Sequence, residues 1–167
     1  EMAMSNVVSE SAHLIFWFSM DYYQITMERL TKMGWKVNPF PLVWHKSDNA
    51  GIAPDPQRGP RRTYETAFFA SRGDRKLTEA GAVSNSFAFP GKKGPDGIHL
   101  SEKPVAMLQH FLRMVCDDYS AVLDPTCGSG NALKAAGNLG AARVLGIEKS
   151  KDFYETAVAK WETVLPN

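Results

Sequence analysis

The segment AVLDPTCGSG, residues 121–130, carries residue types that line ligand sites in α/β proteins. A short apolar strand, predicted over Ala121–Leu123, leads into a turn that contains Gly128 and Gly130. Glycine has no Cβ and tolerates positive φ, so a small molecule can approach the backbone of such a turn closely. The segment therefore predicts a binding loop between a parallel strand and a helix.

The residues after Gly130 argue against the two commonest nucleotide sites. An ATP-binding P-loop needs Lys followed by Ser or Thr after its last glycine, whereas this chain has Asn131 and Ala132. A dinucleotide site needs Gly or Ala three residues after Gly130, where Leu133 stands. The sequence therefore argues against ATP binding. It argues less strongly against NAD binding and does not exclude it, so an NAD-dependent oxidoreductase stays an alternative.

Two carboxylates accompany the loop. Asp124 lies at the carboxyl end of its strand, where its side chain can meet an ammonium group. Glu148 follows the next predicted strand, Arg143–Ile147, where a carboxylate can accept hydrogen bonds from both ribose hydroxyls. A ribose and an amino-acid ammonium together describe S-adenosylmethionine, which is the cofactor we predict. In the alternative, structural interpretation, Asp124 and Ser129 cap the next helix and Glu148 is a solvated strand end.

The predicted elements place this loop in an α/β fold. Strands are predicted at residues 14–18, 42–45, 63–70, 121–123 and 143–147, and helices at 20–33, from 101, at 131–139 and after 148. The alternation of strand and helix near the C-terminus implies parallel strands with right-handed crossovers. Residues 42–45 and 63–70 predict an antiparallel hairpin. We therefore predict a mostly parallel sheet with one antiparallel hairpin and two long loops, 46–62 and 71–98.

Length and composition bound the class of protein. The 167 residues, 44% of them hydrophobic, suffice for one compact domain, which we predict over 1–167. A net charge of +1 gives no global argument for nucleic acid. Cys116 and Cys127 lack the spacing of a zinc site, and we predict no metal. No apolar run approaches the roughly 18 residues of a membrane helix, so we predict a cytoplasmic protein without membrane contact.

Two of these stretches resemble motifs of the amino-methyltransferases that modify adenine N6 or cytosine N4 of DNA. DPTCGSG, residues 124–130, resembles their motif I, D-P-F-x-G-S-G. HLSEKP, residues 99–104, is similar to their motif X, H-P-x-x-K-P, which precedes motif I in the permuted β-type members. Leu100 and Thr126 depart from these patterns. The resemblance implies a Rossmann-like S-adenosylmethionine-dependent methyltransferase fold that acts on double-stranded DNA by base flipping.

The resemblance also implies a set of cofactor-binding residues. They are the turn of motif I, the acidic end of the next strand and part of motif X: Asp124, Pro125, Thr126, Cys127, Gly128, Ser129, Gly130, Glu148, Ser101, Lys103 and Pro104. Taken alone, Lys103 and Pro104 indicate only a helix start.

Four cations of the loop 46–62 are candidates for binding DNA phosphates: Lys46, Arg58, Arg61 and Arg62. The loop holds no aromatic residue that would stack on unpaired bases. A solvated loop without a ligand is therefore an equally good interpretation of these cations.

No catalytic residue can be assigned in this chain. The family carries a D-P-P-Y type tetrad that accepts hydrogen bonds from the target amine and stacks on the flipped base. The Asp-Pro pairs of this sequence, Asp55-Pro56 and Asp124-Pro125, lack the second proline and the aromatic ring. In the permuted order the tetrad precedes Leu14. We therefore expect a domain that is incomplete at its N-terminus, lacks the catalytic-motif strand and is inactive alone.

Other interpretations stay open beside this one. The chain can obtain the missing strand from a partner, as in a homodimer. A catalytically inactive module that binds S-adenosylmethionine and DNA also explains the absent tetrad, and a methyltransferase of RNA or of a small molecule is a further alternative. The recognition sequence and the biological setting, restriction-modification among others, are not determined by these residues.

Overall fold

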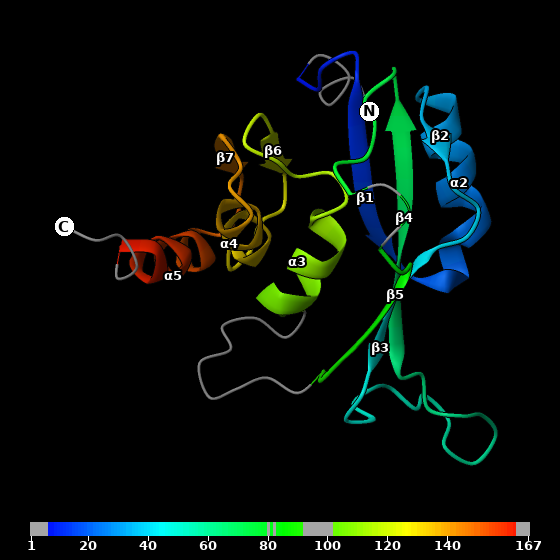
Figure 1. The fold of residues 1–167 in the computed structure, drawn as a ribbon. Helices are drawn as coiled ribbons and strands as arrows, with labels where there is room; N and C mark the ends of the chain where they lie inside the picture. The colour runs from blue at the N-terminus through cyan, green and yellow to red at the C-terminus, as the bar shows by residue number, and fades with distance from the viewer. Residues whose placement is uncertain (1–6, 80, 82, 92–101, 163–167) are drawn as a thin grey trace. The chain divides into compact units, whose positions relative to one another are not determined.

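The computed structural model of the chain describes residues 7–79, 81, 83–91 and 102–162. The chain forms two compact units, residues 1–91 and residues 92–167. Figure 1 shows the elements of both units in order along the chain. The prediction of one domain over residues 1–167 depends on whether these two units pack together, and it stays a prediction.

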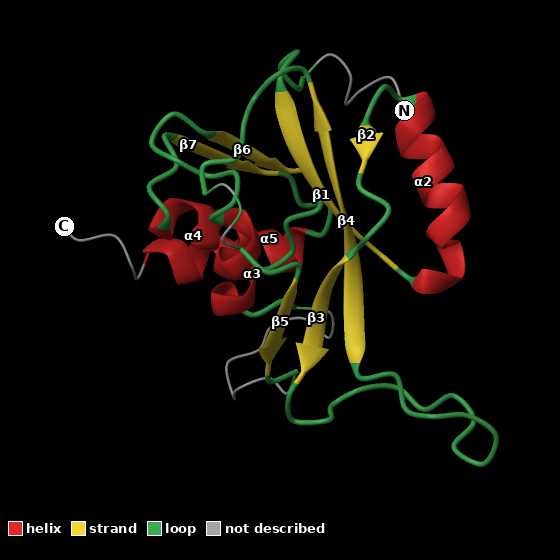
Figure 2. Ribbon diagram, turned by 45° about the vertical axis from the view of Figure 1, so that its right-hand side comes forward, coloured by secondary structure: helices red, strands yellow, loops and turns green. Residues whose placement is uncertain are grey.

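Unit 1 is built on a five-stranded sheet. Its elements are β1 (Ala12–Phe18), the 3-10 helix η1 (Met20–Tyr22), α2 (Tyr23–Lys32), β2 (Lys36–Val37), β3 (Leu42–Lys46), β4 (Tyr64–Arg72) and β5 (Ser86–Phe89). The strand order is β1-β4-β3-β5. The short β2 lies outside this order and also pairs with β4. Strand β4 is thus the centre of the sheet (Figure 2).

The sheet of unit 1 is mixed, which corrects the prediction of a mostly parallel sheet with one antiparallel hairpin. The predicted hairpin is confirmed, since β3 pairs antiparallel with β4 from Leu42 opposite Ala67 to His45 opposite Tyr64. Strands β1 and β2 also run antiparallel to β4, and only β5 pairs in parallel, with β3. The alternation of apolar and polar residues along a strand shows which residues share a face, but it does not show which other strand pairs with that strand.

One predicted loop contains a strand. Strand β5 lies within residues 71–98, where the sequence predicted a long loop, and its four residues SFAF pair with β3. Residues 92–98 of this loop lie outside the described residues. The glycines and polar residues around Ser86–Phe89 obscure a strand this short, which is defined only by its pairing partner.

The core of unit 1 lies between the sheet and α2. Phe68, at the middle of β4, is completely buried and stacks on Phe18 with ring centroids 4.1 Å apart. Leu30 of α2 and Trp35, which follows this helix, are buried in the same cluster. Ser19 caps η1, the 3-10 turn that precedes α2, because its Oγ accepts a hydrogen bond from the Asp21 amide.

Unit 2 contains the predicted βαβα order. Its elements are α3 (Val105–Leu112), β6 (Ala121–Asp124), α4 (Asn131–Asn138), β7 (Arg143–Gly146) and α5 (Lys151–Glu162). Strands β6 and β7 pair in parallel, as predicted. Helix α3 contacts α4, and Phe111 and Ala136 are among their buried residues. Pro104 is the N-cap of α3 rather than part of its first turn.

Replacing Phe68 by Ala is expected to destabilise unit 1 by about 3–5 kcal/mol, because it removes a fully buried ring and leaves a cavity. Urea unfolding followed by tryptophan fluorescence measures this loss, since Trp35 and Trp44 are buried in the same unit. The control is Ile25→Ala on the exposed side of α2, with an expected change of about 0.5 kcal/mol. Equal losses in both variants would contradict this core.

Candidate functional site

The glycine loop of unit 2 has the backbone conformation that its sequence requires. Gly128 and Gly130 have φ angles of +51° and +77°, in the left-handed region where a side chain is strained. The Gly130 amide donates to the Cys127 carbonyl at 2.8 Å and closes the turn, after which α4 begins at Asn131. The predicted turn between strand and helix is therefore present.

The loop is tied to the strand beside it. The Ile147 amide donates to the Asp124 carbonyl at 2.9 Å, and the Cys127 amide donates to the Ile147 carbonyl at 3.0 Å. Gly146 makes this close approach possible, because a Cβ at this position would lie 2.5 Å from Leu133 Cδ1 and 2.7 Å from Cys127 Sγ. Sequence analysis did not single out Gly146, since an isolated glycine at a strand end carries no motif.

Glu148 connects the loop with the start of α5. Its Oε2 accepts a hydrogen bond from the Gly128 amide at 2.9 Å, and its Oε1 accepts one from the Ser150 amide at 2.7 Å. Glu148 is therefore not a solvated strand end. A carboxylate oxygen can accept more than one hydrogen bond, so a carboxylate in this position is a suitable acceptor for hydroxyl donors of a ligand.

Asp124 and Ser129 do not cap α4. Asp124 Oδ1 accepts a hydrogen bond from the Thr126 amide at 3.0 Å and so shapes the beginning of the loop. Ser129 is buried, and Gly130 takes the N-cap position of α4 without any side-chain cap. The structural interpretation of these two residues as helix caps is therefore wrong. The partly exposed Asp124 carboxylate retains acceptor capacity for a cation.

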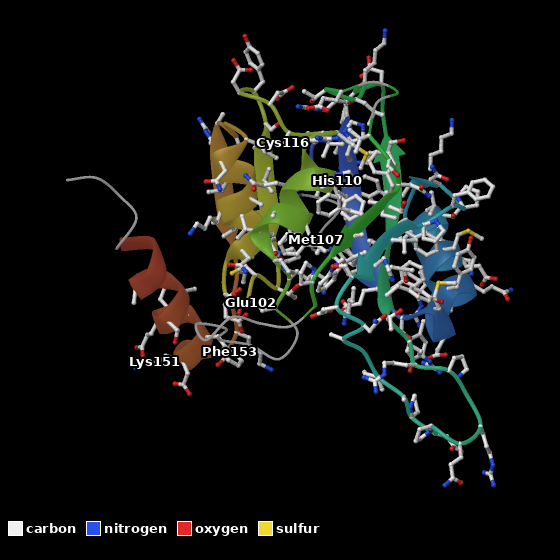
Figure 3. The ribbon with its side chains drawn as sticks, turned by 60° about the horizontal axis from the view of Figure 1, so that its bottom comes forward. Glu102, Met107, His110, Cys116, Lys151 and Phe153 are labelled. Atoms are coloured by element: carbon white, nitrogen blue, oxygen red, sulfur yellow. The ribbon has the colours of Figure 1, made fainter. Side chains whose placement is uncertain are left out.

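Asn131 connects the glycine loop with the segment that precedes α3. Its Nδ2 donates to Glu102 Oε1 at 2.8 Å and to the Lys103 carbonyl at 2.9 Å, so both amide hydrogens are used. Figure 3 labels Glu102 on this segment. The structure thus brings Lys103 and Pro104 of the predicted site to the start of α4, whereas Ser101 lies outside the described residues.

Sequence analysis missed Asn131, which entered only as a residue that is not the lysine of a P-loop. A polar residue with two donors directly after the last glycine was the available signal. Its acceptors lie 28 and 29 positions earlier in the chain, so spacing alone could not identify them.

Two carboxylates and burial act on the thiol of Cys127. Burial, then the negative charge of Asp124, then that of Glu148 raise the pKa of Cys127 above its ordinary value. All three effects disfavour the thiolate. The two carboxylates therefore place negative charge beside the loop, which suits a ligand that brings a positive charge and hydroxyl donors.

The predicted DNA-binding cations belong to unit 1, whereas the glycine loop belongs to unit 2. Lys46 forms an ion pair with Glu65 at 2.8 Å and is largely covered. Arg58 and Arg62 are exposed and form looser pairs, with Asp55 at 3.6 Å and with Asp21 at 3.4 Å. Such surface pairs contribute little stability, so the exposed arginines are better placed than Lys46 to meet a phosphate.

In the part of the chain that the structure describes, no group of three or more His, Cys, Asp or Glu side chains is arranged to hold a metal ion. Within the same residues, no helix has the length and apolar character that crossing a membrane requires.

Comparison with known proteins identifies the family. The model of the N6/N4 family, described as DNA methylase, matches residues 4–159. The chain belongs to this DNA methylase family. A search among curated proteins found no match.

Solved structures of DNA methyltransferases have the same fold. M1.HpyAVI in complex with SAM matches with a TM-score of 0.80 and 18% identity, over 93% of this chain and 77% of that chain. TTHA0409 of Thermus thermophilus, complexed with S-adenosyl-L-methionine and described as a candidate DNA modification methylase, matches with a TM-score of 0.71 and 18% identity, over 98% and 74%.

The cytosine-N4-specific PvuII DNA methyltransferase matches with a TM-score of 0.68 and 14% identity, over 94% of this chain and 64% of that chain. These likenesses show an α/β fold of the methyltransferase type.

The carboxylate of Asp124 is expected to slow alkylation of Cys127. In a Cys116→Ala background, the rate of reaction with iodoacetamide is measured against pH. Because a nearby negative charge disfavours the thiolate, Asp124→Asn should lower the pH midpoint of this rate. The control is Asp118→Asn, an exposed carboxylate before β6, with no shift expected. An unchanged midpoint in Asp124→Asn would contradict the assigned cause.

Proposed function

We propose that this chain is the S-adenosylmethionine-binding part of a DNA amino-methyltransferase that modifies adenine N6 or cytosine N4. The observation that carries the proposal is the conformation of the glycine loop. A hydrogen bond to Glu148 fixes its turn, the absence of a side chain at Gly146 leaves room for it, and the Asp124 carboxylate lies at its start. Membership of the DNA methylase family supports the reaction and the DNA substrate. The solved relatives M1.HpyAVI and TTHA0409 carry this cofactor in their complexes.

The residues of the loop fit the chemistry of this cofactor. It supplies a methyl group on a positively charged sulfonium, and it carries an ammonium group and two ribose hydroxyls. Asp124 would bind the ammonium group, and the Glu148 carboxylate would bind the ribose hydroxyls. Gly128 and Gly130 allow the ligand to contact the backbone. Lys103 and Pro104 would form another wall, held in place through Asn131.

The reaction centre is proposed to come from outside these 167 residues. The sequence contains no D-P-P-Y type tetrad to accept hydrogen bonds from the amine and to stack on the flipped base. Within the described residues, β1 pairs only with β4, and β6 pairs only with β7. The strand that carries the tetrad would pair with the outer edge of β1 in the sheet of unit 1, and it would come from another segment or from a partner chain, because unpaired backbone groups favour strand addition.

A second candidate function is a binding module without catalysis. The absent tetrad favours it, since every residue proposed for the cofactor and for DNA can act without a reaction centre.

The proposed location is the cytoplasm. Cys116 and Cys127 form no disulfide, and this is consistent with a reducing compartment, because disulfides persist in oxidising ones.

Calorimetric titration of the full chain with S-adenosylmethionine tests the cofactor site. The wild-type chain is expected to bind, and Asp124→Ala to lose about 10- to 100-fold in affinity, because a charge-assisted hydrogen bond contributes about 1.5–3 kcal/mol. Asp118→Ala, an exposed carboxylate of the same unit, is the control and should bind like the wild type. A folded wild-type chain that does not bind would overturn the proposal.

Transfer of a radiolabelled methyl group from S-adenosylmethionine to DNA tests the proposed division of labour. The chain alone is expected to transfer no label above background, because no group positions the target amine. A tetrad-containing member of the family serves as the positive control in the same assay. Methylation by the purified chain alone would rule out both the missing reaction centre and the inactive binding module.

A further inference from the structure

Three strands of unit 1 end at the same edge of the sheet. Strands β1 and β3 both run antiparallel to β4, and β5 runs parallel to β3, so β1, β3 and β5 share one direction. Their carboxyl ends are Phe18, Lys46 and Phe89. In open α/β sheets, ligands bind outside the carboxyl ends of the parallel strands. The segments that follow these residues are therefore candidates for contact with a substrate.

A backbone bridge gives the exposed loop between β3 and β4 the form of a finger. Ile52 and Arg62 form a backbone bridge, with N–O distances of 3.3 and 2.8 Å in the two directions. At its tip the Gly59 amide donates to the Asp55 carbonyl at 2.9 Å. Figure 2 shows this loop extending beyond the end of β4. Between Lys46 and Arg62 the finger carries four cations and two carboxylates.

An ion pair holds the base of the finger beside η1. Arg62 Nη1 lies 3.4 Å from Asp21 Oδ2, and both side chains are exposed. Tyr22, the next residue of η1, is 63% exposed. Arg62 thus pairs with the residue that directly precedes an exposed aromatic ring, and this ring comes from an earlier segment of the chain.

Two further exposed rings belong to segments that are linked to Tyr23, the neighbour of Tyr22. Tyr64 is 49% exposed and points to the same face of β4 as Phe68, four residues later, because side chains alternate along a strand. The Phe68 ring contacts Tyr23, the neighbour of Tyr22, with ring centroids 5.0 Å apart. Phe40, which is 74% exposed, follows Pro39, whose carbonyl accepts a hydrogen bond from the Tyr23 hydroxyl at 2.6 Å.

We propose that these side chains form a binding face for unpaired nucleotides of DNA. The aromatic–arginine face is defined as Tyr22, Phe40, Tyr64, Arg61 and Arg62. Exposed rings stack on bases that have left the duplex, and guanidinium groups neutralise the adjoining phosphates. The tertiary structure supplies the aromatic residues that the loop sequence lacks. The inference rests on the proposed function, because chemistry on an exocyclic amine requires the target base to leave the stack.

Charge favours a nucleic acid over a protein as the occupant of this face. The rings do not form a closed apolar patch, since exposed arginines adjoin Tyr64 in the sequence and meet η1 through Asp21. The Arg62–Asp21 pair is exposed and therefore weak, so a phosphate can replace Asp21 as the partner of Arg62. The centre of a protein–protein interface, by contrast, is depleted in charged residues.

The test is fluorescence anisotropy of a labelled single-stranded oligonucleotide with the full chain, at low salt and without S-adenosylmethionine. Tyr22→Ala and Tyr64→Ala are each expected to weaken binding by about 5- to 100-fold, and Tyr22→Phe, which keeps the ring, to bind like the wild type. Tyr119→Ala is the matched control, since Tyr119 is 83% exposed but lies in unit 2. Arg61→Ala with Arg62→Ala should make the dependence of log K on log salt shallower by about 1.4.

The outcomes separate this inference from the proposed cofactor site. Single-strand binding that is unchanged in both tyrosine variants, or lost equally in Tyr119→Ala, would overturn the face. A wild-type chain that binds S-adenosylmethionine but no oligonucleotide would overturn the face alone, whereas oligonucleotide binding without cofactor binding would overturn only the cofactor site. Light scattering that shows a dimer abolished by Tyr22→Ala would assign the face to a second copy of the chain instead. Circular dichroism of every variant confirms that it is folded.

Discussion

The Glu148 carboxylate determines the shape of the candidate cofactor site. It accepts the Gly128 amide on one oxygen and the Ser150 amide on the other, and so joins the glycine loop to the start of α5. Hydrogen bonds to a charged acceptor are roughly twice as strong as neutral ones. A short loop with two glycines has many conformations available, and this carboxylate, together with the backbone bonds between Asp124, Cys127 and Ile147, selects one of them.

The same arrangement creates the electrostatics of the site. Burial raises the pKa of the Cys127 thiol, and the charges of Asp124 and Glu148 raise it further, although both carboxylates accept hydrogen bonds from backbone amides. A ligand with a positive charge gains from this potential, and an added phosphate would be repelled by it. The geometry therefore favours a cationic nucleoside over ATP or NAD, in agreement with the family to which the chain belongs.

Strand β4 has the corresponding role in unit 1. It pairs with β1, β2 and β3, and its central residue Phe68 anchors the core against α2. Because β1 and β3 both oppose β4, their carboxyl ends share an edge, and the basic finger and η1 meet there through Arg62 and Asp21. The two units thus divide the proposed work, with cofactor chemistry in one and contact with DNA in the other.

The sequence by itself determined the local elements of this protein. Apolar runs, the glycines at 128 and 130, and the motif around Asp124 depend on neighbouring residues only, and they predicted β1, α4, β6, β7 and the binding loop. The tertiary structure alone decided which strands lie side by side, and so made the sheet of unit 1 mixed. It also joined Asn131 to Glu102 and Glu148 to Gly128, and it brought Asp21 beside Arg62. These contacts join residues far apart in the chain, and their positions follow from how whole elements pack rather than from any local pattern.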